Sequence, residues 1–184
     1  MQYIEEENFK NLDYLEQAEY EYCSFLDCNF SNSDFSKMKF NECEFVNCNL
    51  SNIILDNTSF RDVGFKNSKM FGLQFGDCNE FGLSFEFINC SLSHSSFYRN
   101  TIRNTLFKES LLHEVDFTDS DLAESIFDKC DFARARFSNT NIQKADFRTS
   151  FNYSIDPDIN KVKKAKFSSF GLAGLLDKYD IEIL

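Results

Sequence analysis

Large apolar residues recur at every fifth position over most of the chain. A first series runs from Phe25 to Phe85, and a second, displaced by two residues, runs from Leu92 to Phe147. Glu80 is the one polar residue in either series. A period of five fits neither the 3.6 residues of a helix nor the two of a strand. The pattern therefore predicts that the repeat is itself the structural unit and that the chain is a solenoid.

A second regular position lies two residues before each member of the series, and it holds small or moderately apolar side chains. All seven cysteines occupy it. The other three positions of each repeat are mostly Asn, Ser, Asp, Glu, Lys and Arg, so we expect them to face solvent. Free cysteine packs as a small hydrophobe, and the cysteine count is odd. We therefore predict buried reduced thiols, with no disulfide and no metal site.

The repeat resembles the pentapeptide-repeat family, whose consensus is A(D/N)LXX. The matching segments include CNFSN (28–32), SDLAE (120–124) and ADFRT (145–149), and the resemblance covers roughly residues 18–149. It implies an all-β fold, a right-handed quadrilateral β-helix with four pentads in each coil. Some 25 pentads would then form about six coils, a rod roughly 30 Å long at about 4.8 Å per coil.

Charged residues twenty positions apart, which would be neighbours on adjacent coils, have opposite signs in the second half of the chain. Cross-strand pairs of this kind contribute about 0.2 to 1 kcal/mol each, and they oppose slippage of the register. The predicted pairs are Arg99 with Asp119, Glu109 with Lys129, Glu114 with Arg134, Asp116 with Arg136, Glu124 with Lys144, and Lys108 with Asp128, which also meets Arg148.

The breaks in the pattern divide the chain into parts. We expect an N-terminal cap at 1–20, a first repeat block at 21–87 with a break near 76–91, a second block at 88–150, and a C-terminal cap at 151–184. Off-series Phe71, Phe81 and Phe87 gather near the break, together with glycines. They form either an exposed patch for a partner or a bulge whose rings fold over a kink, since the two-residue shift requires a bulge.

After Phe147 the pentads are expected to stop. Asp156 as N-cap and Pro157 at the next position predict one helical turn. Residues 162–167 are expected to form a strand, Ser168 or Ser169 to cap a short helix ending near Lys178, and residues 181–184 to form a last strand. The helix is a candidate for dimerisation, through Phe170, Leu172, Leu175, Leu176 and Tyr179.

The net charge is −11, and it is unevenly distributed. Residues 1–91 hold 16 acids and 6 bases. Such a surface repels nucleic acid and anionic membranes and favours basic partners, unless it serves only solubility. The chain has no apolar run of about 18 residues, and residues 1–10 do not resemble a signal peptide. We therefore expect no direct nucleic-acid binding, no membrane association and a cytoplasmic location.

The sequence offers little support for catalysis. His94 and His113 occupy outward positions, and no Ser or Cys is placed beside them as a nucleophile. No phosphate-binding loop, dinucleotide fingerprint or zinc spacing is present. A continuous rod also provides no evident cleft in which burial would shift the pKa of a carboxylate. We predict a protein that is not an enzyme and uses no cofactor.

The C-terminal segment resembles one branch of the family, the Qnr and McbG type proteins, through IDPDINKVKKAKF (155–167) and DIEI (180–183). The resemblance implies an acidic homodimeric rod that mimics duplex DNA and protects DNA gyrase or topoisomerase IV from quinolones or peptide toxins. The alternative is a general protein-interaction scaffold. The acids expected to carry DNA mimicry are Asp27, Asp34, Glu42, Glu44, Asp56 and Asp62.

Overall fold

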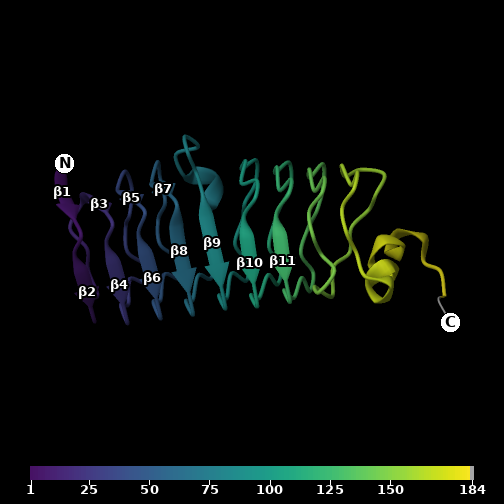
Figure 1. The fold of residues 1–184 in the computed structure, drawn as a ribbon, viewed down its shortest axis with the longest axis horizontal. Coiled ribbons are helices and arrows are strands. Elements are labelled where there is room, and N and C mark those ends of the chain that lie inside the picture. Colours follow the sequence, from purple (N-terminus) through teal and green to yellow (C-terminus); the bar gives the residue numbers. More distant parts are fainter. Residues whose placement is uncertain (183–184) are drawn as a thin grey trace.

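Each coil of the chain pairs its short strands with the coils before and after it, and the coils stack into a rod (Figure 1). The computed structural model describes residues 1–182. The N-terminus lies at one end of the rod and the C-terminal segment at the other. All named strand pairs are parallel. The predicted right-handed quadrilateral β-helix is confirmed.

Four faces run along the rod, and we name them A to D in chain order. Face A contains a four-stranded sheet: β1 (Gln2–Glu5), β3 (Ala18–Glu21), β5 (Lys39–Asn41) and β7 (Ser59–Arg61). Face B contains a seven-stranded sheet: β2 (Asn8–Lys10), β4 (Ser24–Leu26), β6 (Glu44–Val46), β8 (Val63–Lys66), β9 (Phe85–Ile88), β10 (Leu106–Lys108) and β11 (Ile126–Asp128). Within the described residues, faces C and D contain no named strands, and isolated bridges join successive coils along them. Asn29 bridges to Asn49 on face C, and Asp34 bridges to Ile54 on face D.

Stacked coils are offset by twenty residues over most of the rod, as Phe25 opposite Phe45 and Phe107 opposite Phe127 show. Two steps differ. The first coil is shorter, because Gln2 lies opposite Ala18. The coil at the break is longer by two residues. Residues 1–20, expected to cap the rod, thus contribute strands β1 and β2 to its two sheets.

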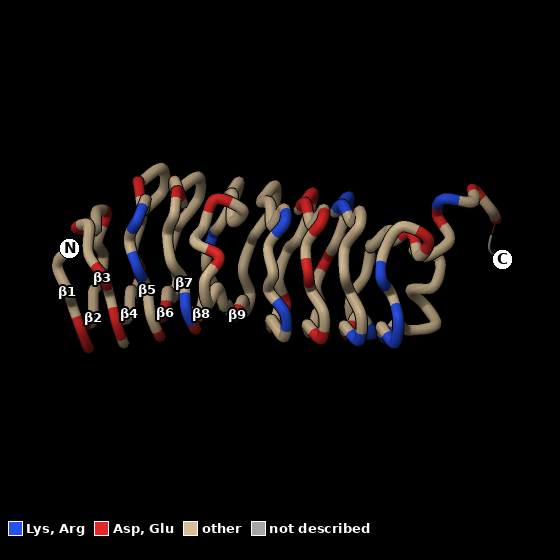
Figure 2. The backbone as a smooth tube through the Cα atoms, turned by 90° about the horizontal axis from the view of Figure 1, so that it is seen from above, with Lys and Arg blue, Asp and Glu red and all other residues tan. Residues whose placement is uncertain are grey.

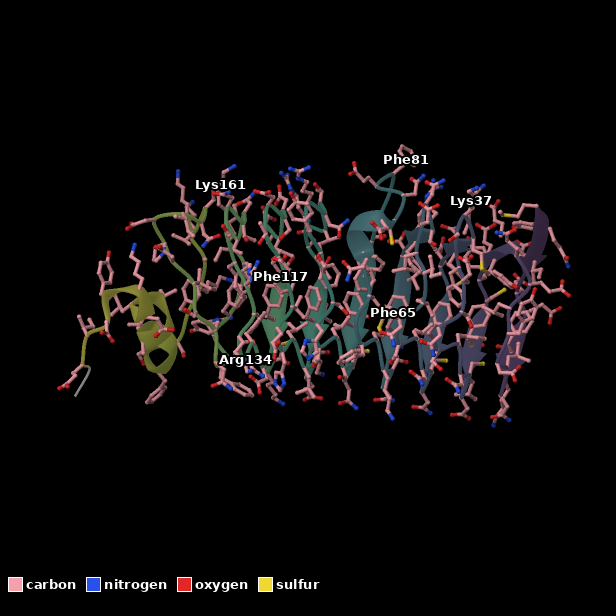
Figure 3. The ribbon with its side chains drawn as sticks, turned by 180° about the vertical axis from the view of Figure 1, so that it is seen from behind. Lys37, Phe65, Phe81, Phe117, Arg134 and Lys161 are labelled. Carbon is pink, nitrogen blue, oxygen red and sulfur yellow. The ribbon has the colours of Figure 1, made fainter. Side chains whose placement is uncertain are left out.

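Aromatic rings fill the core in columns parallel to the rod axis. Along face B, successive rings are stacked with centroids 4.5–5.4 Å apart and planes within 9–23° of each other. The column consists of Phe9, Phe25, Phe45, Phe65, Phe87, Phe107, Phe127, Phe147 and Phe167. Phe65 and Phe117 point into the rod in Figure 3. The inward direction of the five-residue series is confirmed, and the column extends beyond both predicted ends.

The corners of the coils have left-handed backbone. The residue two positions after nearly every series member has a positive φ, and 26 non-glycine residues from Glu6 to Lys164 have this conformation. Asparagine is the commonest of them, because it tolerates this conformation better than most side chains. Corner residues of consecutive coils lie one above another. Their outward side chains therefore form rows along the four edges of the rod.

The two extra residues at the break form an outward loop at 79–84. Before the loop Asn79 N–H donates to Thr58 O, and after it Val63 N–H donates to Ser84 O. Glu80, which interrupts the five-residue series, is exposed. The rod continues in the same direction on both sides of the loop (Figure 1). The loop therefore absorbs the change of phase without a kink.

The C-terminal segment departs from the sequence-based expectation in three ways. Residues 162–167 are not a strand but complete another coil, in which Phe167 stacks on Phe147 at 5.3 Å. Residues 157–159 form a turn rather than a helical turn. The expected helix is two 3-10 segments, η2 (Ser169–Leu175) and η3 (Asp177–Tyr179). Ser168 caps η2 by accepting a hydrogen bond from Gly171 N–H at 3.2 Å, as predicted.

The expected last strand is not seen among the described residues, and one short helix was not predicted. Residues 181 and 182 are not in a strand, and the rest of the expected last strand lies outside the described residues. A third 3-10 segment, η1 (Phe75–Asp77), precedes the loop at the break. No helix within residues 1–182 is long and apolar enough to cross a membrane.

Candidate protein-binding surfaces

The corner between faces A and B carries a row of exposed acidic and tyrosine side chains in the first half of the rod. We call Glu6, Tyr22, Glu42 and Asp62 the acidic edge. Consecutive members of the row are about 4.8 Å apart, because each belongs to the next coil. All four have left-handed backbone and exposed side chains. The nearby carboxylate of Glu42 raises the pKa of the Tyr22 phenol, chiefly through its charge.

More carboxylates adjoin the acidic edge on face A. Glu5 and Glu21 lie opposite each other in strands β1 and β3. The Tyr3 hydroxyl donates a hydrogen bond to the Glu21 carboxylate, and this bond raises the pKa of Tyr3. The negative charge of the edge thus extends onto the neighbouring sheet.

The six acids predicted to act together are distributed over more than one face. Glu42 and Asp62 stack on the acidic edge, and Glu44 lies beside them on face B, where it pairs with Lys66 and raises the pKa of that lysine. Asp27 lies at the corner between faces B and C and accepts a hydrogen bond from Asn47 at 3.1 Å. The six acids therefore do not share one face of the rod.

The remaining two acids of the predicted set lie on face D, opposite face B. Asp34 bridges to Ile54 on this face, and Asp56 follows one coil later. Hydrogen bonds from Ser36 lower the pKa of Asp34. A flat partner in contact with the acidic edge would not reach this pair, which makes Asp34 and Asp56 a useful comparison set.

Most acids of the first half have no basic partner. Of the 16 in residues 1–91, three lie within 4.0 Å of a base: Asp27 with Lys10, Glu19 with Lys39 and Glu44 with Lys66. Within residues 92–147 seven of nine acids have such a partner, counting the two histidines. Figure 2 shows acidic positions at the N-terminal end and mixed charges further along. Uncompensated charge is concentrated in the first half.

Four of the charge pairs predicted at twenty-residue spacing are confirmed. They are Arg99 with Asp119 at 3.9 Å, Glu109 with Lys129 at 3.0 Å, Glu114 with Arg134 at 2.5 Å and Glu124 with Lys144 at 2.5 Å. The other pairs are neighbours in the expected register, but no ion pair joins them within the described chain. Arg148 instead pairs with Asp146 of its own coil at 2.7 Å.

The three phenylalanines near the break do not form one patch. Phe87 is fully buried in the face B column between Phe65 and Phe107, so its assignment to an exposed patch was wrong. Phe81 projects from the loop with 75% of its surface exposed (Figure 3), and the Arg61 guanidinium lies 5.0 Å from its ring centroid. Phe71 is 45% exposed and lies beside His94 on another part of the coil.

The surface between the acidic edge and the break is hollowed. Asp62, Gly64, Glu86 and Arg103 are among the residues lining a shallow groove of about 400 Å³. Gly64 leaves room there, since the nearest side-chain atoms to an added Cβ would belong to Glu44 at 3.8 Å. The groove places one more carboxylate, that of Glu86, beside the edge.

The C-terminal cap exposes apolar side chains at the end of the rod. Phe170 is 98% exposed, and Leu172 and Tyr179 are about half exposed. Leu175 and Leu176 are partly buried, and Leu175 packs against the core. The candidate dimerisation set therefore divides into residues that attach the cap and residues that face outward.

The cysteines are buried in the core, and the two histidines contact carboxylates. All seven thiols are free and buried, as predicted. Burial raises the pKa of Cys43, Cys48 and Cys130 to about 12, so these thiols stay protonated and poorly nucleophilic. His94 and His113 contact Glu114 and Asp131 at 3.3 and 2.8 Å. No group of three metal-binding side chains occurs within residues 1–182.

Comparisons with known proteins agree with this architecture. A family model described as a pentapeptide repeat region matches residues 18–86 and 83–151. QnrB1, described as a plasmid-mediated fluoroquinolone resistance protein, has a solved full-length structure that superimposes with a TM-score of 0.58 at 15% identity, over 97% of this chain and 100% of that one. A trypsin-treated variant of QnrB1 gives 0.63 at 18% identity, over 100% and 92%.

A third solved structure is more distant. HetL from the cyanobacterium Nostoc, a pentapeptide repeat protein involved in heterocyst differentiation regulation, gives a TM-score of 0.37 at 11% identity, over 91% of this chain and 86% of that one. No match was found among curated proteins. The likeness to QnrB1 spans both chains almost from end to end, and at this identity it concerns the fold.

Proposed function

The chain belongs to the pentapeptide-repeat family, and we propose that it is a non-enzymatic protein whose acidic N-terminal half takes the place of duplex DNA on a type II topoisomerase, DNA gyrase or topoisomerase IV. The surface that makes this contact is the acidic edge with the adjoining carboxylates of faces A and B. In this role the protein would protect the enzyme from quinolones or toxins.

The observation that carries the proposal is the density of uncompensated charge. Residues 1–91 have a net charge of −10 and span five coils, about 24 Å of the rod at 4.8 Å per coil. This is about one net negative charge per 2.4 Å, against about one per 1.7 Å in duplex DNA. A protein groove that binds phosphates with Lys and Arg would meet a similar field.

The arrangement of the acids supports the same proposal. Carboxylates left without basic partners retain their charge for a basic surface, and long-range attraction to that surface speeds association. The likeness in fold to QnrB1, a fluoroquinolone resistance protein, points to topoisomerases as the class of partner. The break adds a groove with Asp62 and Glu86, which extends the acidic surface beyond the edge.

A gyrase supercoiling assay with and without a quinolone tests the proposal. We expect the protein to inhibit supercoiling at high concentration or to restore it in the presence of the drug. The double variant Glu42→Gln, Asp62→Asn should lose at least tenfold in potency. The matched variant Asp34→Asn, Asp56→Asn removes the same charge from face D and should lose less than threefold. Equal losses in both variants, or no effect of the wild type, would reject the acidic edge as the contact surface.

The second candidate function is a general protein-interaction scaffold, and the loop at the break favours it. Phe81 is the most exposed aromatic residue outside the C-terminal cap, and Arg61 beside it completes a surface typical of interface anchors. Under this alternative Phe81→Ala would abolish capture of a partner in pull-downs, whereas Glu42→Gln, Asp62→Asn would leave capture intact. Under the topoisomerase proposal the two results would be reversed.

We also propose that the outward residues of the C-terminal cap join two rods. Phe170 and Leu172 present apolar surface at the end of the molecule, and burial of this surface would favour a dimer. Light scattering should give twice the chain mass, and Phe170→Glu should reduce it to the mass of one chain. A wild-type protein that is monomeric at high micromolar concentration would contradict the proposed dimer.

A further inference from the structure

The sign of the charge reverses along the rod. Residues 1–128 have a net charge of −14, residues 129–166 have +5 and residues 167–184 have −2. The positive segment contains nine bases and four acids. Basic positions follow one another along the last coils in Figure 2. The chain, although its net charge is −11, therefore contains a basic region near its C-terminal end.

Four lysines of this region gather where faces A and B meet, further along the same corner that carries the acidic edge. We call Lys144, Lys161, Lys163 and Lys164 the lysine corner. Lys161 lies on face A opposite Asn141 of the coil below, and Figure 3 shows it on the outside of the rod. Lys144 N–H donates to Lys163 O at 3.1 Å, which stacks the two coils at the corner. Lys144 and Lys164 both have left-handed backbone, and all four side chains are exposed.

Three of these lysines have no anionic partner. Lys144 pairs with Glu124 at 2.5 Å, whereas Lys161, Lys163 and Lys164 lie within 4.0 Å of no carboxylate in the part of the chain that the structure describes. The next base on face B, Lys166, shares Asp146 with Arg148. The carboxylates of Glu124 and Asp146 are thus already compensated, and three ammonium groups remain available to a ligand.

We propose that the lysine corner is a binding site for the phosphate backbone of duplex nucleic acid. Lysine binds phosphates as a compact point charge with three donors. Each strand of a duplex presents a phosphate about every 3.4 Å along the axis. Lys161 and Lys163 are two residues apart on one coil, about 6.6 Å along the strand, and Lys164 follows at the corner, so each can reach a separate phosphate. Recognition of this kind is independent of sequence, because the contacts involve no base edges.

The acidic half does not prevent this contact. Asp62 and Lys164 occupy the same corner five coils apart, about 24 Å at the spacing between coils. The Debye length is about 8 Å at physiological ionic strength, so the field of the acidic edge is largely screened at the lysine corner. The expectation that the chain does not bind nucleic acid rests on the acid excess of residues 1–91, and the lysine corner lies outside that segment.

This inference is independent of the proposed topoisomerase contact, since the two sites lie in opposite halves and the test uses DNA alone. Fluorescence anisotropy with a labelled 20-base-pair duplex would measure binding by the full chain from 50 to 200 mM salt. Release of counterions from three phosphates gives a slope of about −2.7 in log affinity against log salt. Affinity should therefore fall about 40-fold over this range.

The decisive comparison uses two charge-matched variants. Lys163→Glu, Lys164→Glu should weaken binding at 50 mM salt by more than tenfold. Lys37→Glu, Lys69→Glu, which makes the same change of charge in the N-terminal half, should weaken it less than threefold. Circular dichroism and melting temperatures should show that both variants fold.

Three results would overturn the proposal. These are no binding of the duplex at 50 mM salt, equal losses in the two variants, or a lysine-dependent association with vesicles containing anionic lipid in the absence of any DNA binding.

Discussion

The coils before and after the break share one core but differ at their corners. Before it, several corner residues stack as amides, with a hydrogen bond from Asn52 to Asn32 at 3.4 Å, and a similar bond of 2.8 Å from Asn89 to Asn67 spans the break. After it, corner residues stack as ion pairs, such as Glu109 with Lys129 at 3.0 Å. The core fixes the coil, and the corners are free to carry either neutral or charged rows. The acidic edge is a third kind of row, in which the acids hold left-handed corners without a basic partner in the described chain.

The amide and ion-paired corners show that the coil can be stabilised with or without charged side chains at its corners. Asparagine meets the conformational demand of a left-handed corner by itself, whereas a glutamate or lysine there gains from a partner of opposite sign one coil away. The second half therefore neutralises most of its own acids. In the first half asparagines hold many of the corners, whereas the acids of the acidic edge hold theirs without a basic partner within residues 1–182 and keep their charge for binding.

Removal of a core ring should have the largest effect and should be equal in the two halves. Phe45→Ala and Phe107→Ala each delete a fully buried ring stacked on both sides. Each should lower the free energy of unfolding by about 3–5 kcal/mol, measured by chemical denaturation. A difference greater than about 2 kcal/mol between the two would show that the halves do not share one kind of core.

A methyl group added at the C-terminal cap should have a smaller effect than loss of a ring. The Cβ of Gly171→Ala would meet the Tyr153 hydroxyl at 1.9 Å, whereas that of Gly64→Ala would have no atom nearer than 3.8 Å. The first change should cost about 1–3 kcal/mol as overpacking, and the second should leave the melting temperature within 1–2 °C. An equal shift in both variants would contradict the packing of the cap on Tyr153.

Corner substitutions should cost about 1 kcal/mol or less and should distinguish the halves by the salt dependence of that cost. Asn52 has a φ of 58°, so Asn52→Ala should cost about 1 kcal/mol from the left-handed backbone. Its cost should not depend on salt. Glu114→Gln, which loses contacts with His94 and Arg134, should cost less than about 1 kcal/mol at low salt. That cost should decline further at 0.5 M salt, because the pair is partly exposed. Thermal denaturation at two salt concentrations measures both costs. A salt-dependent cost for Asn52→Ala with a salt-independent cost for Glu114→Gln would contradict the prediction.

Acid should loosen the second half first, and this effect should be the smallest. Hydrogen bonds and ion pairs from Arg103 and Arg148 lower the pKa of Asp121 and Asp146 below the ordinary value of 3.8. Carboxylates with depressed pKa values stabilise the fold above their unfolded pKa and lose that contribution as pH falls through the folded value. Hydrogen exchange from pH 6 to pH 3 should therefore show protection declining first in residues 92–147, below about pH 4. Earlier loss in residues 21–67 would contradict this order.

The five-residue series predicted the core but not the corners. Spacing alone identified the inward rings, including the column that contains Phe25 and Phe107, and the twenty-residue charge pairs. Phe87 was misplaced although its signal was present, because it lies five residues before Leu92 and so begins the second series. Counting positions within a coil would likewise have placed Asp34 and Asp56 on a different face from Glu42.

Other features could not be predicted. The sixteen-residue first coil is not evident from the sequence, because Ile4 and Phe9 lie in a different phase from Leu15, Tyr20 and Phe25. The left-handed corners follow from the geometry of the coil and not from residue type, because Glu, Lys and Arg occupy many of them. The course of the loop at 79–84 depends on whether each nearby phenylalanine belongs to the first or the second five-residue series. Packing in the folded rod decides between the two.

The most direct test is a competition between this protein and duplex DNA for immobilised DNA gyrase. The wild type should displace labelled duplex from the enzyme, and the face D variant Asp34→Asn, Asp56→Asn should do so with similar potency. The acidic-edge variant Glu42→Gln, Asp62→Asn should need at least ten times the concentration. Gyrase bound by the wild type without displacement of DNA, or displacement that the acidic-edge variant preserves, would contradict the claim that uncompensated acids of the first half replace DNA.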